Sequence, residues 1–308
     1  MLARALALVL LVAHPGLAVA AKRVNKAIEL LAQGQPVYYT TSRGGYAEGK
    51  ELAGTWADYI NYELEHGAFD IPRLREFLQG LVDGGPTPSG HRTPAVIVSL
   101  PVLGLDEASM RANSWVVQQA LAAGVHGLIL CRARSPEAVR VFVEASRYPF
   151  HQGGVGDTLG EGFRGSGSQG FAAGIWGVSG DEYLKLAEPW PLNPDGELLL
   201  GLKIEDRQAL ENAERSTRVP GIAFAEWGPG DMGFSFGFPK REPGPYPQVM
   251  QDARRRVLKA TEAAGIFFLD AVSPDDVESK IEEGVRIGAS GPEAAERGRR
   301  FTRRETPW

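Results

Sequence analysis

Three short apolar runs of this chain lead to side chains that can bind a metal ion or move a proton. One run ends in Glu205, another passes through a glycine-rich turn to Asp231, and an earlier one ends in His66. Bounded runs of this length are typical of buried strands. If the strands are parallel neighbours, two carboxylates and an imidazole converge on one point, which suits a divalent cation with a base beside it. The sequence therefore favours an enzyme.

The two acids are candidate metal ligands. Glu205 and Asp231 offer hard oxygen donors, which suit Mg²⁺, Mn²⁺ or a similar cation. Gly228 and Gly230 let the backbone come close to a ligand and expose N–H groups to an anion, so we expect them to bind substrate. The alternative for either acid is a helix N-cap, because a helix is expected just after each.

A lysine and a histidine accompany these acids. Lys203 lies two residues before Glu205, on the same face of an alternating strand. It could bind a carboxylate, polarise a carbonyl or, with a lowered pKa, form a Schiff base. His66 follows Glu63 and Glu65, and strand alternation leaves room for one of these acids beside the imidazole, where it would raise the basicity of the ring. A structural role is the alternative for His66, but its neighbours favour catalysis.

Apolar runs alternate with amphipathic stretches along the chain. Eight strand–helix units in this order predict an α/β fold, a (β/α)8 TIM barrel, in preference to an open sheet. Such a barrel carries its chemistry at the carboxyl ends of its strands, which is where His66, Ser99 and Glu205 fall. The predicted strands are 36–40, 58–66, 94–100, 127–131, 197–205, 221–227, 265–270 and 285–290, and the predicted helices include 71–81, 107–123, 136–146 and 246–264.

One segment departs from this alternation. Residues 150–195 are rich in Gly, Ser and Pro, and we expect an irregular insertion between strands four and five, on the catalytic face. It would form a lid or a subunit contact, or have no direct role. Residues 21–308 are otherwise expected to form a single barrel domain.

Composition excludes some partners. The 308 residues carry a formal net charge of -5 and show no basic stripe, which argues against nucleic acid. Cys131 is the only cysteine, so no intramolecular disulfide can form. The local excess of positive charge near the C-terminus is interpreted as a solvated helix face. It consists of Arg297, Arg299, Arg300, Arg303 and Arg304.

The N-terminus has the pattern of a signal peptide. A short positive region ends at Arg4, and residues 5–13 form an apolar stretch too short to span a bilayer. Ala18-Val19-Ala20 has the form of a signal-peptidase site. We predict a signal peptide over residues 1–20, cleavage after Ala20, export to the periplasm or medium, and no membrane span. The alternatives are a start codon placed too far upstream and an uncleaved leader.

Several motifs together resemble one family. In order and spacing they are similar to those of the HpcH/HpaI family, the class II pyruvate-type aldolases that act on 4-hydroxy-2-oxo acids. The resemblance covers nearly the whole mature chain. Its motifs are Glu65-His66-Gly67, residues 124–130, residues 135–149, Lys203-Ile204-Glu205, Val219-Pro220-Gly221 and Gly228-Pro229-Gly230-Asp231.

The resemblance implies roles for these residues. A divalent metal would be held by Glu205 and Asp231, chelate the carboxylate and keto oxygen of pyruvate, and stabilise the enolate. His66, paired with Glu63, would handle the proton. A homo-oligomer, trimer or hexamer, is implied, with a C-terminal helix over residues 292–304 exchanged between neighbours.

Two positions depart from the family pattern. The family has an arginine at the end of the third strand that holds the pyruvate keto oxygen, where this chain has Ser99 and no arginine. It also has a glutamine where this chain has Lys203. Ser99 is expected to face the substrate, and our hypothesis is that Lys203 takes over the electrophilic role.

The predicted function is that of a metal-dependent carbon–carbon lyase. It would reversibly cleave a 4-hydroxy-2-oxo acid to pyruvate, or an analogue, and an aldehyde, with Mg²⁺ ahead of Mn²⁺ or Co²⁺ as cofactor and a small-molecule 2-oxo acid as substrate. One alternative is a lyase or hydrolase acting on another 2-oxo acid or an acyl thioester. The other is an exported protein that binds a metal or a 2-oxo acid without turnover.

Overall fold

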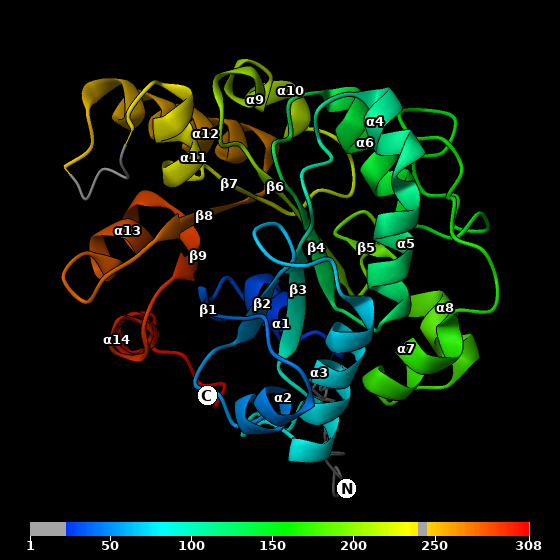
Figure 1. The fold of residues 1–308 in the computed structure, drawn as a ribbon. Helices are drawn as coiled ribbons and strands as arrows, with labels where there is room; N and C mark the ends of the chain where they lie inside the picture. Colours follow the sequence, from blue (N-terminus) through cyan, green and yellow to red (C-terminus); the bar gives the residue numbers. More distant parts are fainter. Residues whose placement is uncertain (1–22, 240–244, 308) are drawn as a thin grey trace, which may run out of the picture.

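The computed structural model, which describes residues 23–239 and 245–307, is built around a closed barrel of parallel strands (Figure 1). Eight strands pair in the order β4-β3-β2-β1-β9-β8-β7-β6, and β4 pairs with β6 to close the ring. The predicted (β/α)8 barrel is therefore confirmed. The eight strands are β1 (Val37–Ser42), β2 (Tyr59–Glu63), β3 (Ala95–Ser99), β4 (Gly127–Leu130), β6 (Leu198–Lys203), β7 (Phe224–Glu226), β8 (Phe267–Ala271) and β9 (Val285–Ala289).

The barrel interior is closed at its amino end by a helix. Ile28 and Leu31 of α1 (Lys26–Ala32) are buried in one cluster with the strand residues Tyr59, Ile97 and Leu199. Alternation along the strands turns one set of apolar side chains inward, and α1 covers that set from below. The carboxyl end has no such plug and carries the polar residues.

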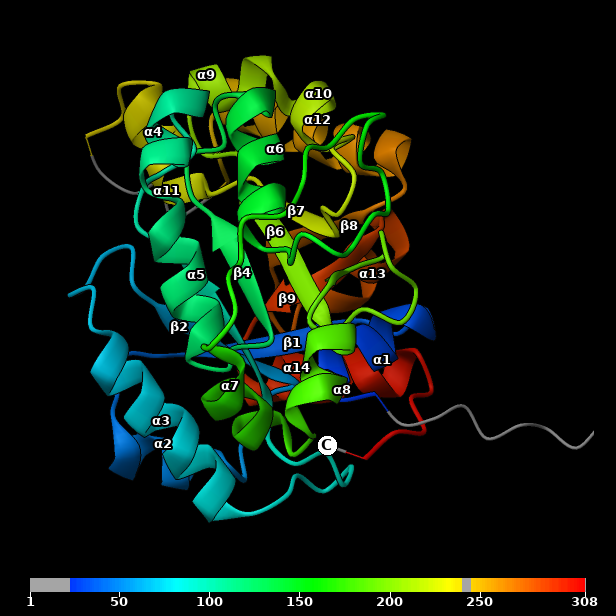
Figure 2. The ribbon, with the colours of Figure 1, turned by 90° about the vertical axis from the view of Figure 1, so that its right-hand side faces the viewer.

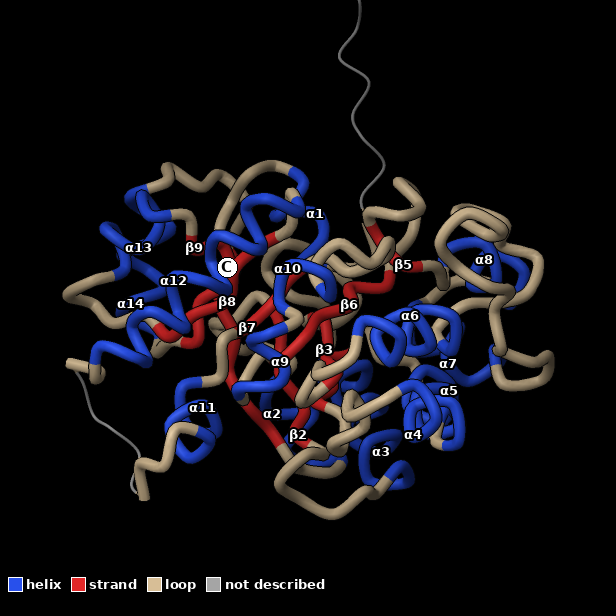
Figure 3. The backbone as a smooth tube through the Cα atoms, turned by 90° about the horizontal axis from the view of Figure 1, so that it is seen from above, coloured by secondary structure: helices blue, strands red, loops and turns tan. Residues whose placement is uncertain are grey.

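Helices surround the strands, as the view from above shows (Figure 3). The helix predicted over residues 107–123 is divided at Asn113, whose backbone ends one helix and begins the next. The helices after α1 and before the insertion are α2 (Tyr46–Leu52), α3 (Ile71–Gly84), α4 (Glu107–Ala112), α5 (Ser114–Ala122) and α6 (Pro136–Ala145). Those after it are α9 (Arg207–Glu211), α10 (Ala213–Ser216), α11 (Pro229–Ser235), α12 (Gln248–Ala264), α13 (Val277–Glu283) and α14 (Pro292–Phe301).

The insertion between barrel strands four and five is only partly irregular. It contains α7 (Gln169–Trp176), α8 (Gly180–Leu186) and a ninth strand, β5 (Pro189–Trp190), which pairs with β6. Trp176 stacks on His126, immediately before β4, so α7 lies at the amino end of the barrel. Figure 2 shows α7 and α8 at the same end as α1 and α14. The expected position on the catalytic face is therefore wrong for these elements, because α6 returns the chain to the amino end first.

The terminal helix packs against its own barrel. Ala294, Ala295 and Arg299 of α14 are buried, and Arg304 beyond it is 7% exposed. The interpretation of the arginine-rich tail as a solvated face is therefore wrong for Arg299 and Arg304, which bind the buried carboxylate of Asp58. These ion pairs hold the C-terminal segment to the barrel of the same chain, and the exchange of the helix between neighbours stays a prediction.

The predicted signal peptide, residues 1–20, lies outside the described residues. Within the two described stretches, 23–239 and 245–307, no helix combines the length and the apolar character needed to cross a membrane.

Candidate active site

Glu205 and Asp231 both contact Arg132, the first through its backbone and the second through its side chain. The Arg132 N–H, just after β4, donates to Glu205 Oε1 at 2.9 Å, and Arg132 Nη2 lies 3.2 Å from Asp231 Oδ1. Glu205 follows β6, and Asp231 lies in the first turn of α11. Both acids predicted as metal ligands therefore contact Arg132, and their binding of a metal stays a prediction.

Gly228 allows this close approach. Its backbone is left-handed, with φ of 51°, and a Cβ built there would lie 2.4 Å from the Cβ of Glu205. Any side chain at this position would both strain the backbone and displace Glu205. Gly230 has open space around its position, so the structure gives it no comparable steric role.

The carboxyl group of Glu205 is buried among other acids. Burial raises its pKa to about 8, and the neighbouring Glu65 adds to the shift, while Lys203 opposes it. A carboxyl group in such surroundings gains from any cation that binds it. Glu205 and Asp231 therefore fit a hard divalent cation, and the acids around them add negative charge that favours one.

Lys203 is held among carboxylates. Its Nζ lies 2.5 Å from Glu65 Oε2, and β6–β7 pairing sets Lys203 opposite Glu226. Burial alone would lower the pKa of Lys203, but the charges of nearby acids, Glu226 first among them, outweigh burial and raise it. The amine is therefore protonated, which disfavours a Schiff base and leaves electrophilic or carboxylate-binding roles.

His66 lies at the mouth of the barrel beside Glu65. Its Nε2 is 3.6 Å from Glu65 Oε2, and its side chain is 54% exposed. Glu63 Oε1 instead accepts from the backbone N–H groups of Glu65 and His66, at 2.8 and 3.4 Å. The acid beside the imidazole is therefore Glu65 and not the expected Glu63. Glu63 instead holds the turn that carries Glu65 and His66.

Ser99 lies deeper in the barrel. It is fully buried at the end of β3, and its Oγ donates to Asn61 Oδ1 at 3.0 Å. β2–β3 pairing sets it opposite Glu63. Its hydroxyl is thus part of the barrel interior, level with Glu63.

Two residues of the site were missed in the sequence. Arg132 contacts both proposed metal ligands, and the charge of Glu226 is the largest influence raising the pKa of Lys203. The position of each at a strand end was a usable signal, since Arg132 follows the predicted strand 127–131 directly and Glu226 lies near the end of strand 221–227.

This chain matches a family model and is similar to known proteins. The model of the HpcH/HpaI aldolase/citrate lyase family matches residues 102–295. A hydroxypyruvate/pyruvate aldolase of Deinococcus radiodurans is 29% identical over 219 residues, which are 71% of this chain and 66% of that protein. A 2-keto-3-deoxy-L-rhamnonate aldolase of Klebsiella pneumoniae is 28% identical over 248 residues, 78% of this chain and 77% of that one.

A solved structure shares the fold. An HpcH/HpaI aldolase/citrate lyase family protein from Burkholderia cenocepacia aligns with a TM-score of 0.67 at 21% identity, over 90% of this chain and 95% of the other. The family model matches well over half of the chain, so the family predicted from the strand-end motifs is confirmed, and with it the assignment to aldolase-type lyases. The chain belongs to the HpcH/HpaI aldolase/citrate lyase family.

Proposed function

We propose that this protein is a metal-dependent aldolase that reversibly cleaves a 4-hydroxy-2-oxo acid to pyruvate, or a close analogue, and an aldehyde. The observation that carries the proposal is the contact of Arg132 with both Glu205 and Asp231 at the carboxyl end of the barrel, in a family that contains aldolases. A divalent cation held by these two acids would stabilise negative charge on the keto oxygen of the substrate. Mg²⁺ is our first choice of cation, followed by Mn²⁺ and Co²⁺.

His66 moves the protons of the reaction in this proposal. Its half-exposed imidazole beside Glu65 can take the proton of the C4 hydroxyl, which becomes the aldehyde carbonyl. The C3–C4 bond then breaks, its electron pair stays on the three-carbon fragment, and a proton is returned to C3. Lys203, held protonated by its carboxylate neighbours, adds positive charge near the fragment that receives the electrons.

The test is proton–deuterium exchange at C3 of pyruvate, followed by NMR with and without Mg²⁺, Mn²⁺ or Co²⁺. We expect metal-dependent exchange, reduced at least about a hundredfold in His66→Ala and in Glu205→Gln. Glu211→Gln removes an exposed acid on the surface and serves as the matched control, with unchanged exchange. Metal binding without exchange in the wild type would contradict the proposal and favour a binding protein.

We also propose that the protein is exported. The support is the leader pattern that ends in Ala18-Val19-Ala20. Mass spectrometry of the protein from separated cell fractions tests this, with a mature chain beginning at Ala21 as the expected result and a full-length cytosolic chain as the contrary one.

A trimer or hexamer completes the proposal. Phe69 and Trp115 form an edge-to-face pair that leaves 36% and 51% of these residues exposed, and large exposed aromatics are enriched at interfaces. Light scattering after gel filtration would give the mass, and a monomer would contradict the assignment.

A further inference from the structure

A cavity of about 150 Å³ lies at the amino end of the barrel, opposite the proposed metal ligands. Its walls come from the segment before α1, the loop before β3, the residue before β4 and the end of α7, and Figure 2 shows α1 and α7 at this end. None of its lining residues takes part in the buried ion pairs of Asp58. We call it the amino-end cavity. Its walls include Arg23, Arg92, Thr93, His126, Ile175 and Trp176.

Arg92 is held against the end of α7 with part of its guanidinium unused. Its Nε donates to the carbonyl oxygen of Ile175 at 3.2 Å, and its stem passes close to Gly177, where a Cβ would lie 2.6 Å from Arg92 Cδ. Gly177 also takes the left-handed conformation, with φ of 73°, that ends the helix. Within residues 23–239 and 245–307, no carboxylate pairs with Arg92 and its two Nη groups make no hydrogen bond. These groups and their positive charge remain free to bind an anion.

Two buried side chains of the cavity wall add donors without acceptors. His126 accepts the N–H of Val96 at Nδ1, 3.1 Å away, so its neutral imidazole carries the proton on Nε2. Neither this N–H nor the hydroxyl of Thr93 makes a hydrogen bond within the residues that the structure describes. His126 and Thr93 are only 1% and 2% exposed. Buried donors without acceptors are destabilising, so an occupant of the cavity that offers acceptor oxygens is favoured.

The charge of the cavity favours an anion over water alone. Arg23 already uses its guanidinium on the segment before β6, where its Nη1 lies 3.0 Å from Gly196 O and 3.4 Å from Glu197 Oε1. Arg92 has no such counter-ion, and no acidic side chain is among the described residues that line the cavity. Because Arg92 is exposed, the cavity opens to solution. A small oxyanion would therefore meet one uncompensated positive charge and two buried donors.

We propose that the amino-end cavity binds a small tetrahedral oxyanion, phosphate or sulfate, between Arg92, Thr93 and His126. Such an ion has acceptor oxygens on all sides, and the cavity has room for several water molecules and hence for an ion of this size. Trp176 stacks on His126, so a bound ion would hold α7 and the insertion to the loop before β3. The ion is a stabilising ligand of the amino end, and its binding does not depend on the proposed aldolase activity.

Calorimetric titration with inorganic phosphate tests the site, with sulfate as the second oxyanion and sodium chloride at equal ionic strength as the blank. We expect one saturable site for phosphate, in the millimolar range, in the wild type. Arg92→Gln should weaken binding at least about tenfold, and Thr93→Val, which keeps the shape of the side chain but removes the hydroxyl, about fivefold. The matched control is Arg300→Gln, because this arginine of α14 is 72% exposed and pairs with Glu296, and it should bind phosphate as the wild type does.

Hydrogen exchange followed by mass spectrometry locates the ion without any substitution. Phosphate should slow exchange at residues 90–93 and 172–177 and leave the turn after β2, at the carboxyl end, unchanged. Lys203→Gln should bind phosphate as tightly as the wild type, because Lys203 lies at that other end. Equal phosphate affinity in the wild type and in Arg92→Gln, or loss of binding in Lys203→Gln, would overturn the inference, and so would the absence of saturable binding in the wild type.

Discussion

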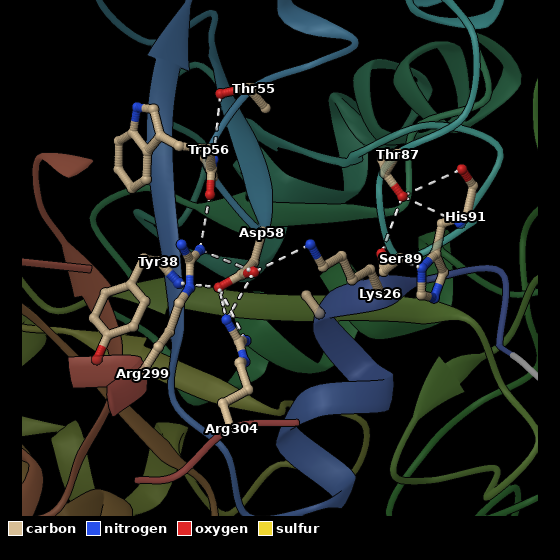
Figure 4. A network of polar contacts seen from close by, with 12 residues as sticks. Lys26, Tyr38, Thr55, Trp56, Asp58, Thr87, Ser89, His91, Arg299 and Arg304 are labelled. Atoms are coloured by element: carbon tan, nitrogen blue, oxygen red, sulfur yellow. Dashed lines mark hydrogen bonds and ion pairs between the residues drawn. The ribbon is translucent and has the colours of Figure 1, made fainter. Parts of the chain in front are cut away.

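The two ends of the barrel bury opposite excesses of charge. At the carboxyl end, acids outnumber bases around the site: Glu63, Glu65, Glu205, Glu226 and Asp231 lie with Lys203 and Arg132. At the amino end the order is reversed, since the single carboxylate of Asp58 lies among three cations (Figure 4). The acid-rich end is open to solvent through the mouth of the barrel, and the base-rich end is covered by α1 and α14.

The amino end satisfies its charges from within the chain. Arg304 Nη1 lies 3.0 Å from both oxygens of Asp58, Arg299 Nη2 3.1 Å and Lys26 Nζ 3.3 Å from Oδ1, and the N–H of Tyr38 donates at 3.0 Å. Burial would raise the pKa of Asp58, but these cations lower it. Burial lowers the pKa of Lys26, and the charge of Asp58 opposes this shift.

This difference suggests a binding role for the carboxyl end and a stabilising role for the amino end. An excess of acid at an open end can be relieved by a cation from solution, so it favours a binding site. The excess of positive charge around Asp58, at the amino end, is covered by two helices, so ions from solution do not reach it. Its ion pairs instead hold α1, β2 and the C-terminal segment together. Substitutions can disturb either end separately.

The largest effect is expected from Asp58→Asn. This change leaves three buried cations without their shared counter-ion, which we expect to lower the free energy of unfolding by about 3 to 5 kcal/mol. Urea unfolding followed by circular dichroism measures the loss. The proposed metal ligands are at the other end of the barrel, so the folded fraction should retain metal affinity.

The control for this change is an exposed ion pair. Glu214 and Arg256 lie 2.8 Å apart, with 42% of each side chain exposed. Glu214→Gln should therefore change the free energy of unfolding by less than about 1 kcal/mol. An equal cost for the two substitutions would show that the Asp58 network is not a special anchor.

Lys203→Gln should separate turnover from metal binding at the carboxyl end. Loss of the protonated amine removes positive charge next to Glu65 and Glu226, so we expect turnover to fall about a hundredfold, equivalent to about 3 kcal/mol. Metal affinity, measured by calorimetry, should change less than about threefold because Lys203 contributes no ligand atom. A fully active variant would refute the electrophilic role.

Borohydride trapping sharpens the same prediction. The carboxylates that raise the pKa of Lys203 keep its amine protonated, so pyruvate with borohydride should leave no covalent adduct detectable by mass spectrometry. Lys185→Gln, an exposed lysine of α8, is the matched control for loss of one charge. A trapped adduct at Lys203 would support a Schiff-base mechanism instead.

The sequence was sufficient for the barrel and for the end of it at which the predicted metal ligands lie. Short apolar runs alternating with helices specify eight parallel strands, and parallel strands put Glu205 and Asp231 at one end. Strand alternation does not extend into the turns, however, so the choice between Glu63 and Glu65 as the partner of His66 depended on the turn after β2. The ion pairs of Arg299 and Arg304 with Asp58 join residues more than 240 positions apart, and no local pattern predicts such contacts.

The smallest expected effect concerns His126, near the sealed amino end. Its ring is stacked on Trp176, and its Nδ1 accepts from the N–H of Val96 at 3.1 Å, which requires that nitrogen to be unprotonated. Burial, with the nearby His91, lowers the pKa of His126 to about 3. In the unfolded chain the ordinary histidine pKa is about 6.5. Below that pH, His126 therefore binds a proton in the unfolded state but not in the folded state.

Stability should therefore fall as the pH drops below about 6.5, by about 2 kcal/mol between pH 7 and pH 5 from this group alone. Glu197 acts in the opposite direction, because burial raises its pKa to about 6 and the folded state takes up its proton first as the solution is acidified. Glu205, whose pKa burial raises to about 8, acts in the same direction as Glu197. The pH dependence of the wild type alone thus mixes groups with opposing effects. His126→Asn keeps an acceptor for Val96 but cannot titrate, so urea unfolding of both proteins at pH 7 and pH 5 isolates the histidine. The variant should lose less stability on acidification than the wild type, and equal losses would mean that His126 is not held neutral by the fold.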